Sequence, residues 1–362
     1  MSELQKSLLV IGAVVVAAVY GYNRLQERSF RRRMQQAFGA AHDDVLLKAG
    51  VESALADGRL EPQLLSPSEP SNEEDDAQAE PAASRGDDTE ARFDSVLDCL
   101  AEINADTPLP EAAIAELLSR VAGCGKPVQA AGYDPQHSRW EDVARGQTGR
   151  YSRLRLSLQL VNRAGSLNAA QLAAFCDAVR QCAARASARA TCPDAESVLK
   201  SAQELDAFCG QVDNAVGVNV VAAEGASFSG ARIRSLAETA GFQLEPDGVF
   251  HFRNERRQTL FTLDNHEPAP FLPESIKLLT TRGVTLLLDV PRVANAVDAL
   301  DRMVEIARGL ASAMGGQMVD DNRAVLSDAG IARIKEQVVA IQSAMSARGI
   351  PAGGARALRL FS

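Results

Sequence analysis

The sequence is poor in aromatic residues, contains few cysteines and has no excess of positive charge. Aromatic residues make up 5% of the 362 residues and hydrophobic residues 46%, so we expect cores built from Ala, Val and Leu. The 47 acidic residues outnumber the 38 basic ones, which argues against a generally basic surface for nucleic acid. The six cysteines include no C-x-x-C pair, so we expect no disulfide framework and a reducing compartment.

Motifs for metal binding, nucleotide binding and catalysis are also missing. The four histidines have no H-E-x-x-H spacing, and no nucleophile, base and orienting residue occur together. We therefore expect no metal site, no cofactor and no enzymatic activity. Residues 123–127 lack the leading glycine of a phosphate-binding loop. Asp320 and Asp321 are neighbours, and neighbours on a strand point to opposite faces, so we assign them to a turn.

A run without charged residues extends from Ser7 to Asn23 and contains the stretch LLVIGAVVVAAVYGY. As a helix it would be roughly 25 Å long, just enough to cross a bilayer. The alternatives are a cleaved signal peptide and a buried core helix. A signal peptide is disfavoured because Lys6 is balanced by Glu3 before the run, whereas arginines follow it. We therefore predict a single transmembrane anchor over residues 1–23.

Basic residues follow the predicted anchor in a segment, 24–47, with apolar residues at roughly helical spacing. By the positive-inside rule they keep this flank in the cytoplasm and the N-terminus outside. Each basic residue near the surface would also attract anionic lipid head groups by roughly 1 kcal/mol. The alternative is that they act only as a topology signal. The arginines concerned are Arg24, Arg28, Arg31, Arg32 and Arg33.

The composition then changes to an acidic stretch. Residues 57–90 contain eleven acidic residues, two arginines, four prolines and no aromatic residue. Such a segment cannot bury enough apolar surface to offset the entropy of ordering it. We predict a disordered, extended linker over residues 48–92. A role for the acidic stretch in docking a partner is the alternative.

From residue 93 onward, strand-like and helix-like patterns alternate, and their order occurs twice. The segments RLRLSLQLV at 153–161 and GVTLLLDVP at 283–291 both alternate with period two. In each half a helix-like stripe ending at a glycine precedes this strand, and two helices follow it. We predict an α+β fold, an antiparallel sheet with helices on one face, arranged as a tandem pair over 93–213 and 214–349. Chance similarity of two α+β segments is the alternative.

The alternation also predicts which side chains lie on the open sheet faces. In the second half, Leu286, Leu288 and Val290 are expected to point inward. In the first half, the outward positions are polar and basic, so we expect this unit either to pack against the second or to offer a basic surface to an acidic partner. Ser327 is the expected N-cap of the last helix. The outward residues are Arg153, Arg155, Ser157 and Gln159 in the first half, and Thr285, Leu287 and Asp289 in the second.

A series of short segments in the last 150 residues resembles a known family in order and spacing. The segments are Ala240-Gly241-Phe242, Leu260-Phe261-Thr262-Leu263 with Asn265, Thr281-x-Gly283-Val284-Thr285, Asp289-Val290-Pro291, and Gly315-Gly316 leading to Val319-Asp320-Asp321-Asn322-Arg323. They resemble the C-terminal domain of ZipA, a membrane-anchored family of bacterial cell-division proteins that bind the polymer-forming protein FtsZ. The anchor, basic flank and acidic linker repeat the layout of that family, whereas residues 93–213 have no counterpart in it.

This resemblance implies a six-stranded antiparallel sheet whose open face carries a shallow apolar groove for the C-terminal peptide of FtsZ. Leu287 is the apolar anchor that we expect there, and the alternative is a singly exposed leucine without a role. Asp247 and His266 are polar where the family groove is apolar, and each lost apolar contact would forfeit about 1–2 kcal/mol. Together, the strand pattern and the resemblance assign peptide binding to Leu287, Thr285, Asp289, His266, Thr262, Val249, Asp247, His251 and Asn219.

These expectations combine into one function and one alternative. The resemblance implies a single-pass protein of the bacterial inner membrane, with a periplasmic N-terminus, that tethers FtsZ filaments at the division site. Its partners would be the FtsZ peptide and the membrane, with no nucleic acid. The alternative is a membrane-tethered sensor or scaffold that binds a small ligand in a deep pocket between the two α+β units. Residues 350–362 are expected to be a tail.

Overall fold

The computed structural model describes residues 93–144, 149–321 and 323–362, which form an α+β fold with antiparallel sheets, as the sequence predicts. Among these residues, no helix is both long enough and apolar enough to span a membrane. Three predicted segments lie outside the described residues: the anchor (1–23), the basic helix (24–47) with Arg24, Arg28, Arg31, Arg32 and Arg33, and the acidic linker (48–92).

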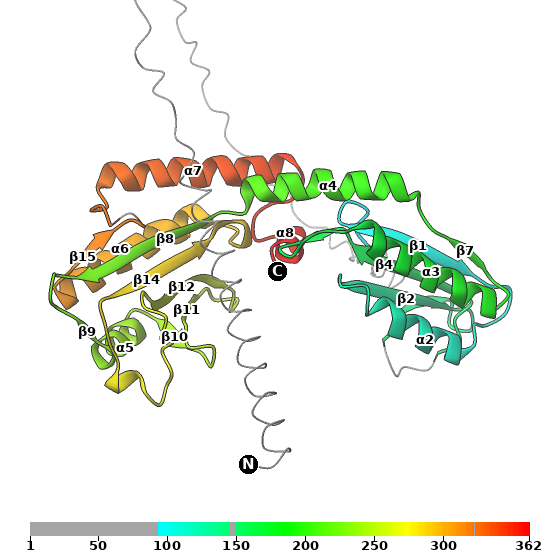
Figure 1. The fold of residues 1–362 in the computed structure, drawn as a ribbon, viewed down its shortest axis with the longest axis horizontal. Coiled ribbons are helices and arrows are strands. Elements are labelled where there is room, and N and C mark those ends of the chain that lie inside the picture. Colours follow the sequence, from blue (N-terminus) through cyan, green and yellow to red (C-terminus); the bar gives the residue numbers. More distant parts are fainter. Residues whose placement is uncertain (1–92, 145–148, 322) are drawn as a thin grey trace, which may run out of the picture. The chain divides into compact units, whose positions relative to one another are not determined.

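The first sheet and its helices are built by residues 98–212. Their elements are β1 (Asp98–Asn104), α2 (Glu111–Val121), β2 (Val128–Asp134), β3 (Arg139–Asp142), β4 (Arg153–Gln159), β5 (Val161–Asn162), β6 (Gly165–Ser166), α3 (Ala169–Arg185), β7 (Arg189–Thr191) and α4 (Ala195–Val212). Five strands form the sheet in the order β3-β2-β4-β1-β7, with antiparallel neighbours (Figure 1). Helices α2 and α3 pack against each other, and α3 also contacts β1 and β7.

The second sheet lies further along the chain. Its elements are β8 (Ala215–Ala222), β9 (Phe228–Ser229), α5 (Gly230–Thr239), β10 (Phe242–Leu244), β11 (Phe250–Arg253), β12 (Thr259–Asn265), the 3-10 turn η2 (Ile276–Leu278), β13 (Thr280–Thr281), β14 (Gly283–Asp289), the 3-10 turn η3 (Val290–Arg292), α6 (Ala296–Met314), β15 (Gly316–Val319), α7 (Asp328–Ala347) and α8 (Ala355–Leu360). Six strands form the sheet in the order β10-β11-β12-β14-β8-β15. The resemblance implied this number of strands.

Local sequence signals explain where several helices begin and end. The side chain of Asn168 accepts a hydrogen bond from the backbone N–H of Gln171, and the Gln171 side chain accepts one from Asn168 N–H in return, which starts α3. Ser327 Oγ accepts from Gly330 N–H at 3.2 Å, so the predicted N-cap of α7 is confirmed. Helix α6 ends at Gly315, whose φ of 67° is a left-handed conformation that favours glycine.

The two sheets share an order of strands. In the first, the strands β2-β4-β1-β7 are neighbours, and in the second, β12-β14-β8-β15 are neighbours. In chain order these are the second, third, first and fourth strands of each set. Each set also has one helix between its first and second strands, a long helix between its third and fourth, and a final helix after the fourth. The common part is therefore a split β-α-β arrangement.

Each sheet has its own hydrophobic core on the face that the helices cover. In the second sheet, Leu286, Leu288 and Val290 are fully buried, and α6 packs over β8 and β14. Aromatic rings fill the part beside β10, where Phe252 stacks on Phe261 at 4.6 Å between ring centroids. The inward positions that the alternation predicts for this strand are confirmed.

The C-terminal residues belong to the first core rather than lying free. Leu360 and Phe361, at the end of α8, are 1% exposed and cluster with the buried residues of the first sheet. Arg359 forms a double ion pair with Asp98 on β1, with N–O distances of 3.0 and 2.5 Å. Residues 350–362, which the sequence analysis treated as a tail, thus include a helix that packs on the first unit.

This helix also changes the outward face of β4. Ser157 and Gln159, which were expected to face outward, are 1% and 2% exposed. The side-chain nitrogen of Gln159 donates to the carbonyl oxygen of Arg359 at 3.0 Å, so the chain around α8 covers this end of the strand. Arg153, by contrast, remains exposed. The prediction of a polar open face is therefore wrong for the Gln159 end of β4, because a segment 200 residues away covers it.

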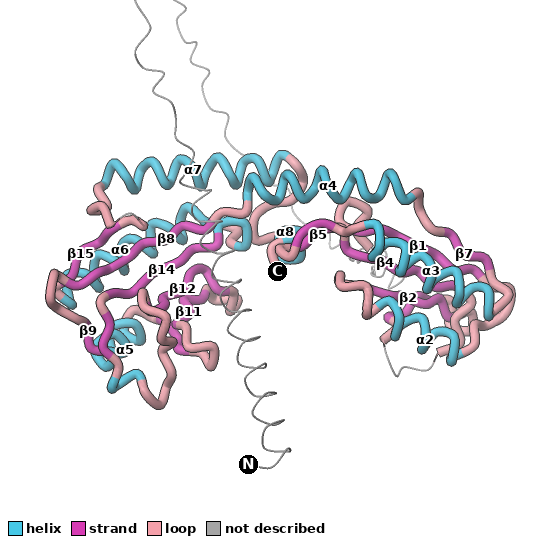
Figure 2. The backbone as a smooth tube through the Cα atoms, viewed as in Figure 1, coloured by secondary structure: helices cyan, strands magenta, loops and turns pink. Residues whose placement is uncertain are grey.

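The long helices α4 and α7 contact each other (Figure 2). Ile341 of α7 packs against both hydrophobic cores. Met345, further along the same helix, is fully buried in the first core. The last helix of the second set of elements therefore contributes side chains to the first unit.

Candidate functional site

The open face of the second sheet is marked by the outward side chains of β14. Thr285, Leu287 and Asp289 are partly exposed, whereas Leu286 and Leu288 between them are fully buried. Strand β14 is central, with β12 on one side and β8 on the other. The outward residues of β14 therefore lie in the middle of the open face, as the alternation predicts.

One row of outward residues crosses the sheet at Leu287. Its members pair in register from β11 through β12 and β14 to β8: His251 with Thr262, Thr262 with Leu287, and Leu287 with Gly217. We call these four residues the Leu287 row. Gly217 has no side chain to stand beside Leu287, and a Cβ there would lie only 3.3 Å from Asp321 Oδ1. The surface beside Leu287 is therefore free of a side chain at Gly217, and the carboxylate of Asp321 lies next to this space.

A second row is polar and hydrogen-bonded from one side of the face to the other. Thr285 Oγ1 donates to Asn219 Oδ1 at 2.7 Å, and Asn219 Nδ2 donates to Asp321 Oδ1 at 3.0 Å. His266 Nδ1 lies 3.2 Å from Thr285 Oγ1. Asn219 is 3% exposed, so its amide is a fixed part of the sheet rather than a free contact group. We call His266, Thr285, Asn219 and Asp321 the polar row.

Two carboxyl groups on this face hold their protons more tightly than usual. Desolvation raises the pKa of Asp321, and the nearby charge of Asp320 adds to the rise, whereas the hydrogen bond from Asn219 opposes it. Desolvation also raises the pKa of Asp264, which pairs in register with Thr285, and the charge of Asp247 acts in the same direction. The face therefore carries less negative charge than its residue types suggest when the pH falls.

Asp247, Val249 and His251 lie together at the turn from β10 into β11. His251 Nε2 is 3.0 Å from Asp247 Oδ2, and Asp247 Oδ1 accepts from Val249 N–H at 3.1 Å. Glu245, which the sequence analysis did not select, lies beside them, with Oε2 at 3.8 Å from His251 Nε2. The structure thus brings three of the predicted residues and one further acid to a single corner of the open face.

Asp289 does not present a free carboxylate. Arg163, on the turn between β5 and β6, donates to both of its oxygens at 2.8 Å and also bonds Asp213 at 2.7 Å. Burial works to lower the pKa of Arg163, but the hydrogen bonds to Asp289 and Asp213 outweigh it and raise that pKa. The structure therefore places Asp289 in an ion-pair group that joins the two α+β units.

Asp321 was not predicted to be a member of this face. Asp320 and Asp321 were assigned to a turn, and both lie in it, where Asp320 Oδ1 accepts from Ala324 N–H at 2.8 Å. The side chain of Asp321 also accepts a hydrogen bond from Asn219 on β8. No local pattern marked this contact, because Asp321 and Asn219 lie 102 positions apart.

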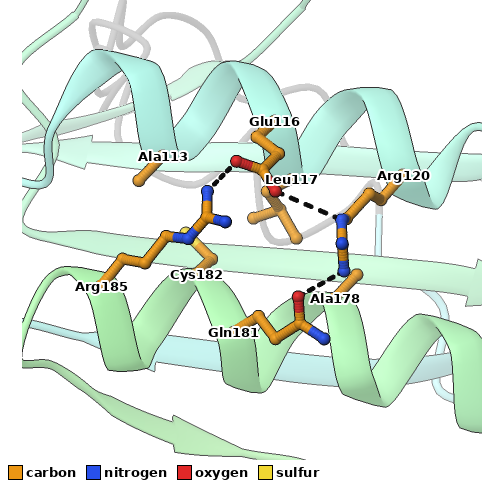
Figure 3. A pocket seen from close by; sticks show the side chains of 8 residues that line it. All are labelled: Ala113, Glu116, Leu117, Arg120, Ala178, Gln181, Cys182 and Arg185. Atoms are coloured by element: carbon orange, nitrogen blue, oxygen red, sulfur yellow. Dashed lines mark hydrogen bonds and ion pairs between the residues drawn. The ribbon is translucent and has the colours of Figure 1, made fainter.

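Three pockets of the described residues lie elsewhere. Figure 3 shows a pocket of about 10 Å³ between α2 and α3, where Glu116 bridges Arg120 and Arg185. It has room for about one water molecule. A larger pocket of about 630 Å³ is lined by residues 93–144, and another of about 260 Å³ mainly by residues 254–302. Gly353, in the C-terminal segment, also lines the pocket of about 260 Å³.

The carboxyl-terminal unit is thus a split β-α-β domain with a six-stranded sheet, helices on one face and a mixed apolar and polar open face. Residues 214–337 match the model of the family described as ZipA, C-terminal FtsZ-binding domain. Over these residues the chain is similar to ZipA-type proteins, and the resemblance seen in the sequence is confirmed.

Individual relatives agree with this match. The chain is 29% identical over 126 residues to cell division protein ZipA of Marinobacter nauticus, covering 33% of this chain and 37% of that protein. It is 29% identical over 145 residues to the ZipA of Ectopseudomonas mendocina, covering 39% of this chain and 53% of that protein. The ZipA of Shewanella loihica is 29% identical over 115 residues, 31% of this chain and 34% of that protein. The chain therefore matches between about a third and a half of the length of these relatives.

Proposed function

We propose that the unit at residues 214–349 binds the C-terminal peptide of FtsZ on the open face of its sheet. The match of residues 214–337 to an FtsZ-binding domain carries this proposal. It is supported by the half-buried Leu287 in the middle of an open face, next to a glycine that leaves space at its side. Exposed sheet faces and edges are common places for peptide binding.

In this proposal, the Leu287 row provides the apolar contact with the peptide, and the polar row provides hydrogen bonds. An apolar side chain of the peptide packs on Leu287, in the space beside Gly217. The hydroxyl group of Thr262 donates or accepts a hydrogen bond, whereas Thr285 Oγ1, which already donates to Asn219, accepts one. Asn219, on the neighbouring strand β8, holds Thr285 in place. Asp289 does not contact the peptide, because both of its carboxylate oxygens accept hydrogen bonds from Arg163. The remaining contact residues are Val249, Asp247, His251 and His266.

Fluorescence anisotropy of a labelled FtsZ C-terminal peptide, titrated with the full chain, tests this site. Leu287→Asp should weaken binding by about tenfold or more, because it removes an apolar contact of about 1–2 kcal/mol and places a charge at the centre of the face. Val339→Asp on α7 is the matched control, since Val339 is also apolar and 47% exposed. Equal affinity of the Leu287→Asp variant and the wild type, with the fold intact, would refute the proposed face.

We further propose that residues 1–23 anchor the chain in the inner membrane and that the basic and acidic segments up to residue 92 link this anchor to the folded units. The charge-free run and the arginines after it support this arrangement. A modest affinity would suffice for tethering, because a filament presents many peptides and raises their effective concentration. Cell fractionation tests the anchor: the full chain should sediment with membranes, and residues 48–362 should not.

We also propose that residues 93–213 are a diverged copy of the domain. The shared order of four strands and the equivalent helices support a duplication. The pairing of Arg163 with Asp289 supports the idea that this copy packs against the FtsZ-binding unit rather than acting on its own. Binding of the FtsZ peptide should accordingly be unaffected by Arg153→Glu, on the exposed part of β4.

A further inference from the structure

The corner of the open face at Glu245, Asp247 and His251 combines three groups that can ligate a metal ion. Two are carboxylates on the turn between β10 and β11, and the third is an imidazole on β11. We propose that this corner binds a divalent first-row transition-metal ion, with Zn²⁺ as the probe. No metal site was expected from the sequence, because its histidines and cysteines lack the close spacings of common metal-binding motifs. The proposal concerns a different ligand from the FtsZ peptide and does not depend on it.

The ligand atoms already converge. One atom of each residue lies within 4.8 Å of those of the other two. His251 Nε2 is 3.0 Å from Asp247 Oδ2 and 3.8 Å from Glu245 Oε2. An ion bound at about 2.0–2.2 Å from nitrogen and oxygen fits among atoms at these separations after small side-chain shifts. Within the described ranges of the chain, this is the one group of three or more potential ligands with such spacing.

The backbone fixes the turn that carries the carboxylates. Gly248 has a φ of 82°, and its N–H donates to the carbonyl oxygen of Glu245 at 3.0 Å. Glu245 N–H donates to the carbonyl oxygen of Val249, also at 3.0 Å, so the turn closes on itself. A Cβ at position 248 would lie 2.5 Å from Pro270, which leaves glycine as the residue that fits. The two acids are therefore held close without an ion.

A group outside the cluster orients the imidazole. Thr259 Oγ1, on the neighbouring strand β12, lies 3.3 Å from His251 Nδ1. A hydrogen bond at Nδ1 leaves Nε2 facing the two carboxylates, which is how protein side chains commonly orient a metal-binding histidine. The ring is largely enclosed, at 16% side-chain exposure, whereas Asp247 is 53% exposed. Solvent can thus reach the open side of the site and complete the coordination.

One cationic side chain, Arg253, partly neutralises the two carboxylates at this corner. Arg253 forms an ion pair with Glu245 Oε1, which leaves Glu245 Oε2 as the oxygen that faces His251. An ion would replace the direct contact between His251 Nε2 and Asp247 Oδ2. A set of two carboxylates and one imidazole suits ions of this class better than Ca²⁺ or Mg²⁺, which prefer oxygen ligands alone.

Isothermal titration calorimetry of the full chain with Zn²⁺, in a buffer without chelators, tests the site. We expect His251→Ala and Asp247→Asn each to bind one equivalent of Zn²⁺ fewer than the wild type. The Thr259→Val variant should bind as many equivalents of Zn²⁺ as the wild type. It should bind the ion at this site about 10–100-fold more weakly, because the His251 imidazole loses its hydrogen-bond partner at Nδ1. Zinc that binds to the six cysteines contributes equally to every variant.

His137→Ala is the matched control. His137 Nδ1 lies 2.6 Å from Asp134 Oδ2, so it forms the same kind of histidine–carboxylate pair without a second carboxylate. This variant should bind as many equivalents as the wild type. Equal stoichiometry in the wild type, His251→Ala and Asp247→Asn would overturn the proposal. If circular dichroism shows that His251→Ala is unfolded, Asp247→Asn decides alone, since its side chain is exposed and nearly the same size.

Discussion

At the scale of single residues, the open face of the second sheet is held by side chains that bond one another. Asn219 is central, because it joins Thr285 on β14 to Asp321 after β15. Asn219 is buried, so water cannot easily take its place as the hydrogen-bond partner of Thr285 and Asp321. Losing it would therefore lower the stability of the fold. The polar row is therefore part of the structure of the face as well as part of its surface.

Asn219→Ala should lower the free energy of unfolding by about 1–3 kcal/mol, because it leaves a desolvated Asp321 carboxyl and a Thr285 hydroxyl without their partner. Urea denaturation followed by circular dichroism measures this. Gln243→Ala, at an exposed position on β10, is the control and should change stability by less than about 0.5 kcal/mol. Equal effects of the two substitutions would show that the polar row contributes nothing to stability.

Asp264 predicts a pH dependence whose sign follows from its raised pKa. The folded state binds this proton more tightly than the unfolded state, so the contribution of Asp264 to stability falls as the pH rises through the window between the two pKa values. Asp264→Asn, which stays neutral, should be more stable than the wild type at pH 7. The difference should shrink as the pH drops toward the ordinary pKa of Asp, near 4. Thermal melts of both proteins from pH 4 to pH 7 measure it, and a difference that grows on acidification would contradict the raised pKa.

At the scale of elements, the period of the hydrophobic pattern predicted individual strands and helices and the faces they bury. It did not predict contacts between residues far apart in the sequence. The alternation of 283–291 predicted β14 and its inward residues, and the helical stripes predicted α3, α6 and α7. The pattern could not predict that Asp289 would meet Arg163, because the two lie 126 positions apart and pair only through the tertiary fold. The prediction of a tail over residues 350–362 was wrong for the same reason. A helix of six residues has too short a hydrophobic pattern to show that it packs on a distant sheet.

Phe361→Ala tests the role of the C-terminal helix. Phe361 is 1% exposed in the first core, and the Arg163 guanidinium lies 5.7 Å from its ring centroid. Its loss should reduce the free energy of unfolding by about 3–5 kcal/mol. Hydrogen exchange should show the largest loss of protection in β1 and β4 of the first sheet. Leu358→Ala, at a position that is 37% exposed, is the control and should have a smaller effect.

At the scale of the described fold, the two α+β units are joined by several kinds of contact. Arg163 of the first unit pairs with Asp289 of the second, α4 contacts α7, and α8 packs into the first core. These contacts come from segments far apart in the sequence. The two units are therefore expected to unfold together rather than one after the other.

Arg163→Met removes the ion pairs while keeping an apolar stem of similar length. It should reduce the free energy of unfolding by about 1–3 kcal/mol, because two partly buried carboxylates lose their ion pairs with the Arg163 guanidinium. Chemical denaturation followed by both tryptophan fluorescence and circular dichroism should then separate into two transitions, since Trp140 reports only on the first unit. Arg180→Met, which removes an exposed pair with Asp177 on α3, should leave a single transition. A single transition in Arg163→Met as well would mean that the ion pairs do not couple the units.

The central claim is that the open face around Leu287 holds the FtsZ peptide. Intermolecular NOEs between the unlabelled peptide and methyl-labelled full chain test it most directly. We predict NOEs from an apolar side chain of the peptide to the methyl groups of Leu287, and none to Val339 on α7. NOEs to Val339 or to methyl groups of residues 93–213, with none to Leu287, would contradict the account.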